Sequence, residues 1–123
     1  MTKLNYFAAV ADLERSQIFY DALLGPGERT QHRLRYLIHG LELHFYQLSP
    51  EQHRDFHLAA PPPQPSQGFS LLYDGPMPPG SRIILDWSHA PWGGWMAHIE
   101  DPDGYRWELR RASASSTDPC QTS

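Results

Sequence analysis

Residues Pro91 to Leu109 read PWGGWMAHIEDPDGYRWEL, and more of the fold follows from them than from any other part of the chain. At residues 101–104, DPDG joins three residue types that build tight turns: proline presets φ, aspartate bonds to nearby backbone N–H groups, and glycine accepts a positive φ. Strand-like sequence lies on both sides of this turn. The stretch therefore predicts a β-hairpin.

The second strand of this hairpin carries one carboxylate. Because successive side chains of a strand point to opposite faces, it divides into a polar set, Arg106, Glu108 and Arg110, and an apolar set, Tyr105, Trp107 and Leu109. Since an arginine fork matches a carboxylate, the simplest role for Glu108 is an ion pair with Arg106, Arg110 or a basic residue of a facing strand.

The start of the chain predicts a strand followed by a helix. Residues 4–10 alternate in polarity, which is typical of a strand. Residues 12–24 have helical spacing, with Asp12 as the N-cap and the glycine-proline-glycine sequence at 25–27 as the stop.

A second hairpin is expected next. Residues 33–38 and 41–48 alternate in polarity and are joined by His39-Gly40, a pair suited to a primed turn. On the second of these strands, side chains of one face are Glu42, His44 and Tyr46, and those of the other are Leu41, Leu43 and Phe45.

The second half of the chain predicts strands without a helix. Residues 49–67 form a proline-rich connector, and residues 69–73 and 82–87 look like strands. Between those strands, the three prolines at 76–79 forbid a regular helix.

Two motifs at opposite ends of the chain resemble the vicinal oxygen chelate superfamily, which holds glyoxalase I, bleomycin-resistance proteins and extradiol dioxygenases. The first is WGGxMA followed by DPDGxxxEL in residues 92–109, and it is similar to the end of such a domain. The second spans Val10 to Ser16 with Phe19-Tyr20 and Leu23-Leu24-Gly25, and it is similar to the superfamily's first helix. The order of the two motifs along the chain is the expected one.

The resemblance implies an α+β fold of paired βαβββ modules forming a curved mixed sheet around a cleft. We expect one domain at residues 1–111, with a first module at 1–48, the connector at 49–67, a second module at 68–111, and a flexible polar tail at 112–123. The second module lacks its helix. Its exposed apolar sheet face would have to be covered by the tail, the connector or a second copy of the chain.

The composition of the chain argues against some classes of binding partner. A net charge of −4 without a basic cluster argues against nucleic acid, and the N-terminus lacks the apolar run of a signal peptide or membrane span. The single cysteine, Cys120, can form no internal disulfide, which fits a reducing compartment. We therefore expect a cytoplasmic protein without membrane contact.

The resemblance also implies four inward positions that hold a divalent metal in enzymes of the superfamily. In this chain they fall on Asn5, Glu42 or His44, Phe69 and Glu108. A catalytic metal needs about three good protein ligands, and phenylalanine supplies none. A metal such as Zn, Ni, Mn or Fe held by Glu42, His44 and Glu108 is therefore the alternative, and no cofactor is the preferred expectation. His44 and His98 are each read first as an ordinary polar group.

Aromatic residues are too numerous for so small a core: Phe7, Tyr46, Phe69, Trp87, Trp92, Trp95 and Trp107. Two of the tryptophans flank Gly93-Gly94, whose backbone can pass close to a ligand or partner. The bleomycin-resistance proteins, to which this stretch is similar, are metal-free dimers that sequester drugs in aromatic clefts.

Three functions are therefore weighed. The preferred one is a homodimer that binds a planar or cationic organic molecule without catalysis, through Phe7, His44, Tyr46, Phe69, Trp92, Trp95 and Glu108. The second is a metal-dependent lyase, isomerase or dioxygenase that uses Glu42, His44 and Glu108. The third is a structural dimer without a ligand, whose cleft is filled by its own side chains.

Overall fold

The computed structural model describes residues 4–47, 49, 51 and 68–112. Most of the expected connector and all of the tail beyond Ala112 lie outside these residues. Within them, one helix and eight strands occur in this order: β1 Leu4–Ala9, α1 Leu13–Leu24, β2 Glu28–Arg29, β3 Arg33–Ile38, β4 Leu41–Tyr46, β5 Gly68–Leu72, β6 Arg82–His89, β7 Trp95–Glu100 and β8 Arg106–Arg111.

The strands form two four-stranded mixed sheets with the same internal order. Sheet A is β1-β4-β3-β2 and sheet B is β5-β8-β7-β6, and in each the first pair is parallel and the others antiparallel. This repetition confirms the α+β fold of paired modules, and the second module has no helix between β5 and β6. The two-residue strand β2 was not predicted, because it is too short to show alternation.

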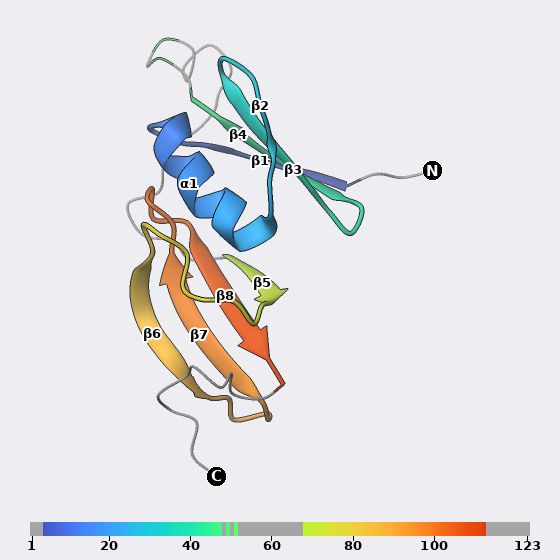
Figure 1. Cartoon of the computed structure of the whole chain (residues 1–123), viewed down its shortest axis with the longest axis vertical. Helices are drawn as coiled ribbons and strands as arrows, with labels where there is room; N and C mark the ends of the chain where they lie inside the picture. The colour runs from blue at the N-terminus through green and yellow to red at the C-terminus, as the bar shows by residue number, and fades with distance from the viewer. Residues whose placement is uncertain (1–3, 48, 50, 52–67, 113–123) are drawn as a thin grey trace.

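Helix α1 lies between the two sheets, as Figure 1 shows. Asp12 caps it by accepting hydrogen bonds from the backbone N–H groups of Glu14 (2.9 Å) and Arg15 (3.3 Å). Its Tyr20 ring stacks on Phe45 of sheet A (centroids 4.2 Å apart) and makes an edge contact with Trp107 of sheet B (5.8 Å). One helix therefore joins both modules into a single core.

The apolar face of sheet B, which lacks a helix of its own, is partly covered from two directions, and Ile83 of β6 on this face stays 48% exposed. Helix α1 packs against it through Tyr20, and the proline-rich segment between β5 and β6 packs Tyr73 and Met77 against the same core. The expected covers were the tail, the connector or a second chain. The first module's helix and a short loop contribute to this cover, while the tail and most of the connector lie outside the described residues. No helix of the described residues has the length and apolar character needed to cross a membrane.

Both predicted hairpins are confirmed. The His39-Gly40 turn has positive φ at both residues (47° and 83°), as a primed turn requires, and Gly104 has a φ of 95° in the DPDG turn. On β8, Trp107 and Leu109 are buried while Arg106, Glu108 and Arg110 lie on the other face, as expected.

One assignment of faces was wrong. Phe69 was placed on the same face as Glu108, but in the parallel β5–β8 pair Phe69 lies beside Trp107 and Ser70 lies beside Glu108. Because side chains alternate, a shift of one residue moves a side chain to the opposite face. Phe69 therefore belongs to the core side of sheet B.

Candidate functional site

Each sheet has an open face, which is the face turned away from α1. The open face of sheet B has a row of three polar side chains, one from each of three adjacent strands. Glu108 of β8 accepts a hydrogen bond from the Ser70 hydroxyl of β5 (2.9 Å), and its second oxygen lies 3.0 Å from Nε2 of His98 on β7. The register places both partners directly beside it. The hydrogen bond with His98 is the largest cause that lowers the pKa of Glu108, and Ser70 and the charge of Arg110 add to it. Glu108 is thus held as an anion.

Neither neighbouring arginine of β8 hydrogen-bonds to Glu108. Arg106 pairs with Glu100 (3.3 Å), and Arg110 is exposed and acts on Glu108 only through its charge. A basic residue of a neighbouring strand was among the expected partners, and His98 has that position. The sequence contained a usable signal: once the turn is centred on residues 101–105, residue 98 falls opposite residue 108.

The open face of sheet A holds a second glutamate in different surroundings. Glu42 is buried, and the Arg35 guanidinium contacts its carboxylate through Nε and Nη2. The Asn5 side chain, with its nitrogen toward Glu42, donates to Oε2 (3.3 Å), and His44 Nε2 lies 4.0 Å away. The arginine lock expected at Glu108 therefore occurs at Glu42.

The predicted aromatic residues occupy three different environments. Phe7 on sheet A is 58% exposed, and the neighbouring rings of His44 and Tyr46 are nearly parallel (6.2 Å, 10°). Trp92, in the turn between β6 and β7, is 61% exposed. Trp95 is only 8% exposed and packs against His89 (4.0 Å). Only Phe7, His44, Tyr46 and Trp92 thus present rings away from the core.

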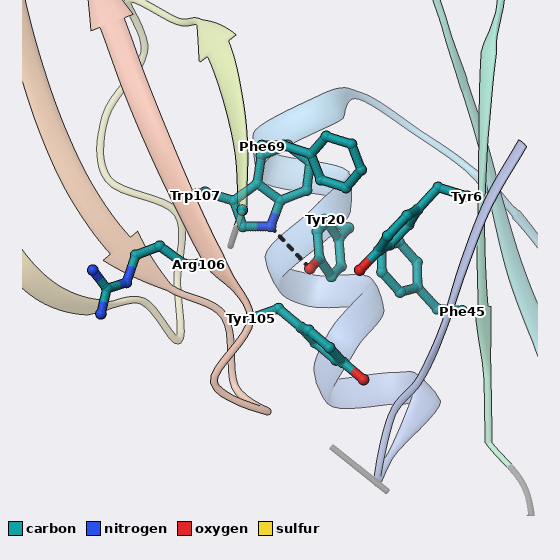
Figure 2. A pocket seen from close by; sticks show the side chains of 8 residues that line it. Tyr6, Tyr20, Phe45, Phe69, Tyr105, Arg106 and Trp107 are labelled. Carbon is teal, nitrogen blue, oxygen red and sulfur yellow. Dashed lines mark hydrogen bonds between the residues drawn. The ribbon is translucent and has the colours of Figure 1, made fainter. Parts of the chain in front are cut away.

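Phe69 lines a small cavity between the two sheets. The cavity is about 20 Å³, enough for one water molecule, and its lining residues are Tyr6, Tyr20, Phe45, Gly68, Phe69, Tyr105, Arg106 and Trp107 (Figure 2). Phe69 meets Tyr6 edge to face at 4.6 Å. Among the described residues, rings therefore fill most of the space between the two modules around this cavity.

The candidate residues are divided between two faces. Phe7, Glu42, His44 and Tyr46 lie on the open face of sheet A, and Glu108 lies on that of sheet B. Both faces point away from α1, because the core sides of both sheets pack against that helix. A shallow groove of about 330 Å³ lies at the end of sheet B and reaches its open face at Leu72 and Arg110; Gly93, Gly94 and Trp95 also line it.

The donor set does not fit the metal that the alternative function requires. Among the described residues, no three His, Cys, Asp or Glu side chains lie close enough together to hold one ion. Within one chain, Glu42 and His44 belong to one sheet and Glu108 to the other, and the remaining positions of the set hold Ser70 and Asn5, which are poor metal ligands. The family-type ligand set is thus broken in both modules.

No protein-family model and no curated protein matches this chain. Several solved structures do match it. A glyoxalase-related enzyme from Fulvimarina pelagi aligns with a TM-score of 0.72 at 21% identity, covering 89% of this chain and 86% of that one. A glyoxalase/bleomycin resistance protein from Albidiferax ferrireducens aligns with a TM-score of 0.59 at 20% identity, covering 86% and 94%.

A third similar structure is a bleomycin resistance determinant encoded on the transposon Tn5, with a TM-score of 0.52, 20% identity and coverage of 90% and 98%. Structural similarity at 20–21% sequence identity establishes the fold and does not establish the activity. The chain has the fold shared by glyoxalase-related and bleomycin-resistance proteins, the superfamily that its two end motifs resemble.

Proposed function

We propose that this protein binds a small, planar or cationic organic molecule on its open sheet faces and does not transform it. The observation that carries the proposal is the environment of Glu108. This carboxylate is partly exposed, has a lowered pKa, and lies in the middle of an open face without an arginine partner. A carboxylate fixed in this way can accept a charge-assisted hydrogen bond from a ligand's cationic group.

The contrast with Glu42 supports this choice of anchor. Glu42 is buried and already neutralised by Arg35, so a ligand cation would have to displace an internal one. Glu108 instead has a neutral hydroxyl and a histidine as partners, and exposed Leu72 lies near it on the same face. The proposed anchor is therefore Glu108, and Glu42 is structural.

The proposal further places the aromatic wall on a second copy of the chain. Within one chain, the cavity that described residues line between the modules admits about one water molecule, and each open face is one-sided. Exposed Phe7 and Leu37 on sheet A and exposed Leu72 on sheet B are apolar surfaces of the kind that interfaces or ligands cover. A homodimer that sets the sheet A face of one protomer against the sheet B face of its partner would form a cleft with rings on one wall and Glu108 on the other.

Fluorescence titration with proflavine and acridine tests the anchor. Both have the same three fused rings, but proflavine is a cation at neutral pH and acridine is neutral. We expect proflavine to bind more tightly, and Glu108→Gln to weaken proflavine by at least about tenfold while leaving acridine unchanged. Glu14→Gln, on the exposed side of α1, is the matched control and should bind both dyes as the native protein does.

Two results would overturn the proposal. Equal affinity of the native protein and Glu108→Gln for proflavine would remove the anchor. Absence of any thermal shift across a broad library of planar and cationic drugs would remove ligand binding itself and favour the structural dimer. Stoichiometric uptake of Ni, Zn, Mn or Fe would instead support the metal-dependent alternative.

A further inference from the structure

The DPDG turn of the second module is anchored on the first module by polar contacts. Asp103 accepts hydrogen bonds from the Ala11 backbone N–H (3.0 Å) and the Arg15 guanidinium (3.0 Å). The Tyr105 hydroxyl donates to the Ala9 carbonyl (2.8 Å). These contacts join residues that lie about ninety positions apart in sequence, so the turn holds the two modules together.

Asp101 is a buried carboxyl of this junction and is 3% exposed. One of its carboxylate oxygens accepts hydrogen bonds from the backbone N–H groups of Asp103 (2.9 Å) and Tyr105 (2.8 Å). The other oxygen accepts from the Tyr20 hydroxyl of α1 (2.5 Å). The Tyr20 oxygen in turn accepts from the Trp107 indole N–H of β8 (3.1 Å), the bond drawn in Figure 2. A chain of hydrogen bonds thus runs from Trp107 through Tyr20 to Asp101.

While Asp101 is ionised, each hydrogen bond between Trp107, Tyr20 and Asp101 has only one possible donor. The indole N–H can only donate, and the Tyr20 proton is used on the carboxylate. If Asp101 takes up a proton on the oxygen facing Tyr20, that contact has two hydrogens and must rearrange, with the Tyr20 hydroxyl turning away or accepting in place of donating. Protonation of one buried carboxyl therefore alters the contact between α1 and sheet B.

We propose that Asp101 is a proton-sensitive coupling between the two modules, whose protonation reorganises the Trp107–Tyr20–Asp101 hydrogen bonds. The groups that face Asp101 come from every element packed on it: Tyr20 from α1, Tyr6 from β1, and Asp103 and Tyr105 from the turn. Arg15 lies one step further away, on Asp103. Within the described residues no cation bonds directly to Asp101.

The direction of the effect follows from burial. Desolvation is the largest cause that raises the pKa of Asp101 from 3.8 to about 6, against the opposing hydrogen bonds from Tyr20 and the backbone, and the charge of Asp103 raises it further. A carboxyl with a raised folded-state pKa binds its proton more tightly in the folded than in the unfolded chain. Its contribution to folding stability therefore increases as pH falls through about 6 and is complete below about 4.

Urea unfolding of the native protein and of Asp101→Asn measures this contribution. All other groups titrate in both proteins, so the difference between the two isolates Asp101. Relative to the variant, we expect the native unfolding constant to fall about 100-fold between about pH 7.5 and about pH 4, since two pKa units correspond to two powers of ten. A constant difference across this range would overturn the proposal.

Carbon-13 NMR of the native protein gives a second test that does not depend on a variant folding. The Asp101 carboxyl should titrate near pH 6, and the Trp107 indole N–H resonance should shift with the same midpoint. In Tyr20→Phe the indole resonance should stop following the titration, whereas Tyr46→Phe, on the open face of sheet A, should leave it unchanged. An Asp101 midpoint below about 4.5, or an indole signal that does not respond in the native protein, would contradict the coupling.

Discussion

Two glutamates at equivalent positions of the two sheets show how neighbours decide the role of a carboxylate. Glu42 and Glu108 each lie on the strand that pairs with the first strand of their module, and each has a small polar neighbour there, Asn5 or Ser70. Arg35 neutralises Glu42 permanently, because a guanidinium keeps its charge at any ordinary pH. Glu108 pairs instead with the imidazole of His98 (3.0 Å) and with the Ser70 hydroxyl. Of these two carboxylates, the proposed function uses Glu108 as the anchor.

Substituting each partner of Glu108 in turn shows which of them lowers the pKa of Glu108 more. Because the hydrogen bond with His98 is the largest cause of the lowered pKa, His98→Ala should raise the pKa of Glu108 toward its ordinary value, and Ser70→Ala should raise it less. The stability that Glu108 contributes is present above the ordinary carboxyl pKa and is lost as pH falls through the lower folded-state value, so His98→Ala should also weaken this acid dependence. Carbon-13 NMR titration of the Glu108 carboxyl measures both variants. A larger shift in Ser70→Ala than in His98→Ala would contradict the ranking.

The anchor residue and a basic partner on the facing strand could be predicted from sequence, but its Ser70 partner could not. Alternation on β8 places Glu108 on a polar face from local sequence alone. Ser70 lies thirty-eight positions away and becomes its neighbour only through a parallel pairing, which local sequence does not specify. Arg35 lies seven positions from Glu42 within one hairpin, yet its register partner is His44, and the guanidinium reaches the glutamate diagonally. Long side chains make such contacts hard to read from a sequence.

Helix α1 and the two hairpins were predicted because caps, turns and alternation are local signals. The register of β5 beside β8 was not, and Phe69 was therefore assigned to the wrong face. The strand begins at Gly68, where a glycine is required for a long-range reason: a Cβ atom at this position would overlap the carbonyl oxygen of Arg106 on β8. In the sequence, a glycine just before a strand is equally consistent with a turn and with close packing against another strand.

Two glycine substitutions distinguish a glycine required for a positive φ from a glycine required for close packing between strands. Gly40 has a φ of 83° and open space around its Cβ position, so Gly40→Ala should cost only backbone strain, about 1 kcal/mol. Gly68→Ala places a methyl group against the backbone of β8, which cannot move without disrupting the sheet, and should cost about 3 kcal/mol or more. Urea unfolding monitored by circular dichroism measures both. Equal destabilisation of the two variants would show that β5 and β8 adjust to admit the methyl group.

The arrangement of the whole chain departs most from expectation, because α1 serves both sheets. A sequence shows that a helix has an apolar face, but not that its Tyr20 will contact Phe45 on one side and Trp107 on the other. Once the helix is shared, the second module needs no helix of its own, and the open faces of the two sheets turn outward. The proposed cleft then requires two chains, with Phe7 from one and Glu108 from the other.

This arrangement predicts complementation between two defective variants. In a homodimer of Phe7→Ala every proposed cleft lacks its exposed ring, and in a homodimer of Glu108→Gln every cleft lacks its anchor, so each variant alone should bind proflavine weakly. In a heterodimer, one cleft joins the two altered faces and the other joins two native ones. Unfolding and refolding an equal mixture should therefore restore native affinity to about a quarter of the sites.

Fluorescence titration of the refolded mixture measures the restored fraction, and each variant refolded alone is the control for the procedure. A mixture that binds no better than the average of its components would place Phe7 and Glu108 on the same chain's site or remove the dimer. Mixing Phe7→Ala chains with Tyr46→Ala chains is a negative control, because both residues belong to the open face of sheet A and every cleft then keeps one of the two defects. Recovery of native sites only when the two substitutions lie on different sheets would therefore identify the cleft as one built between protomers.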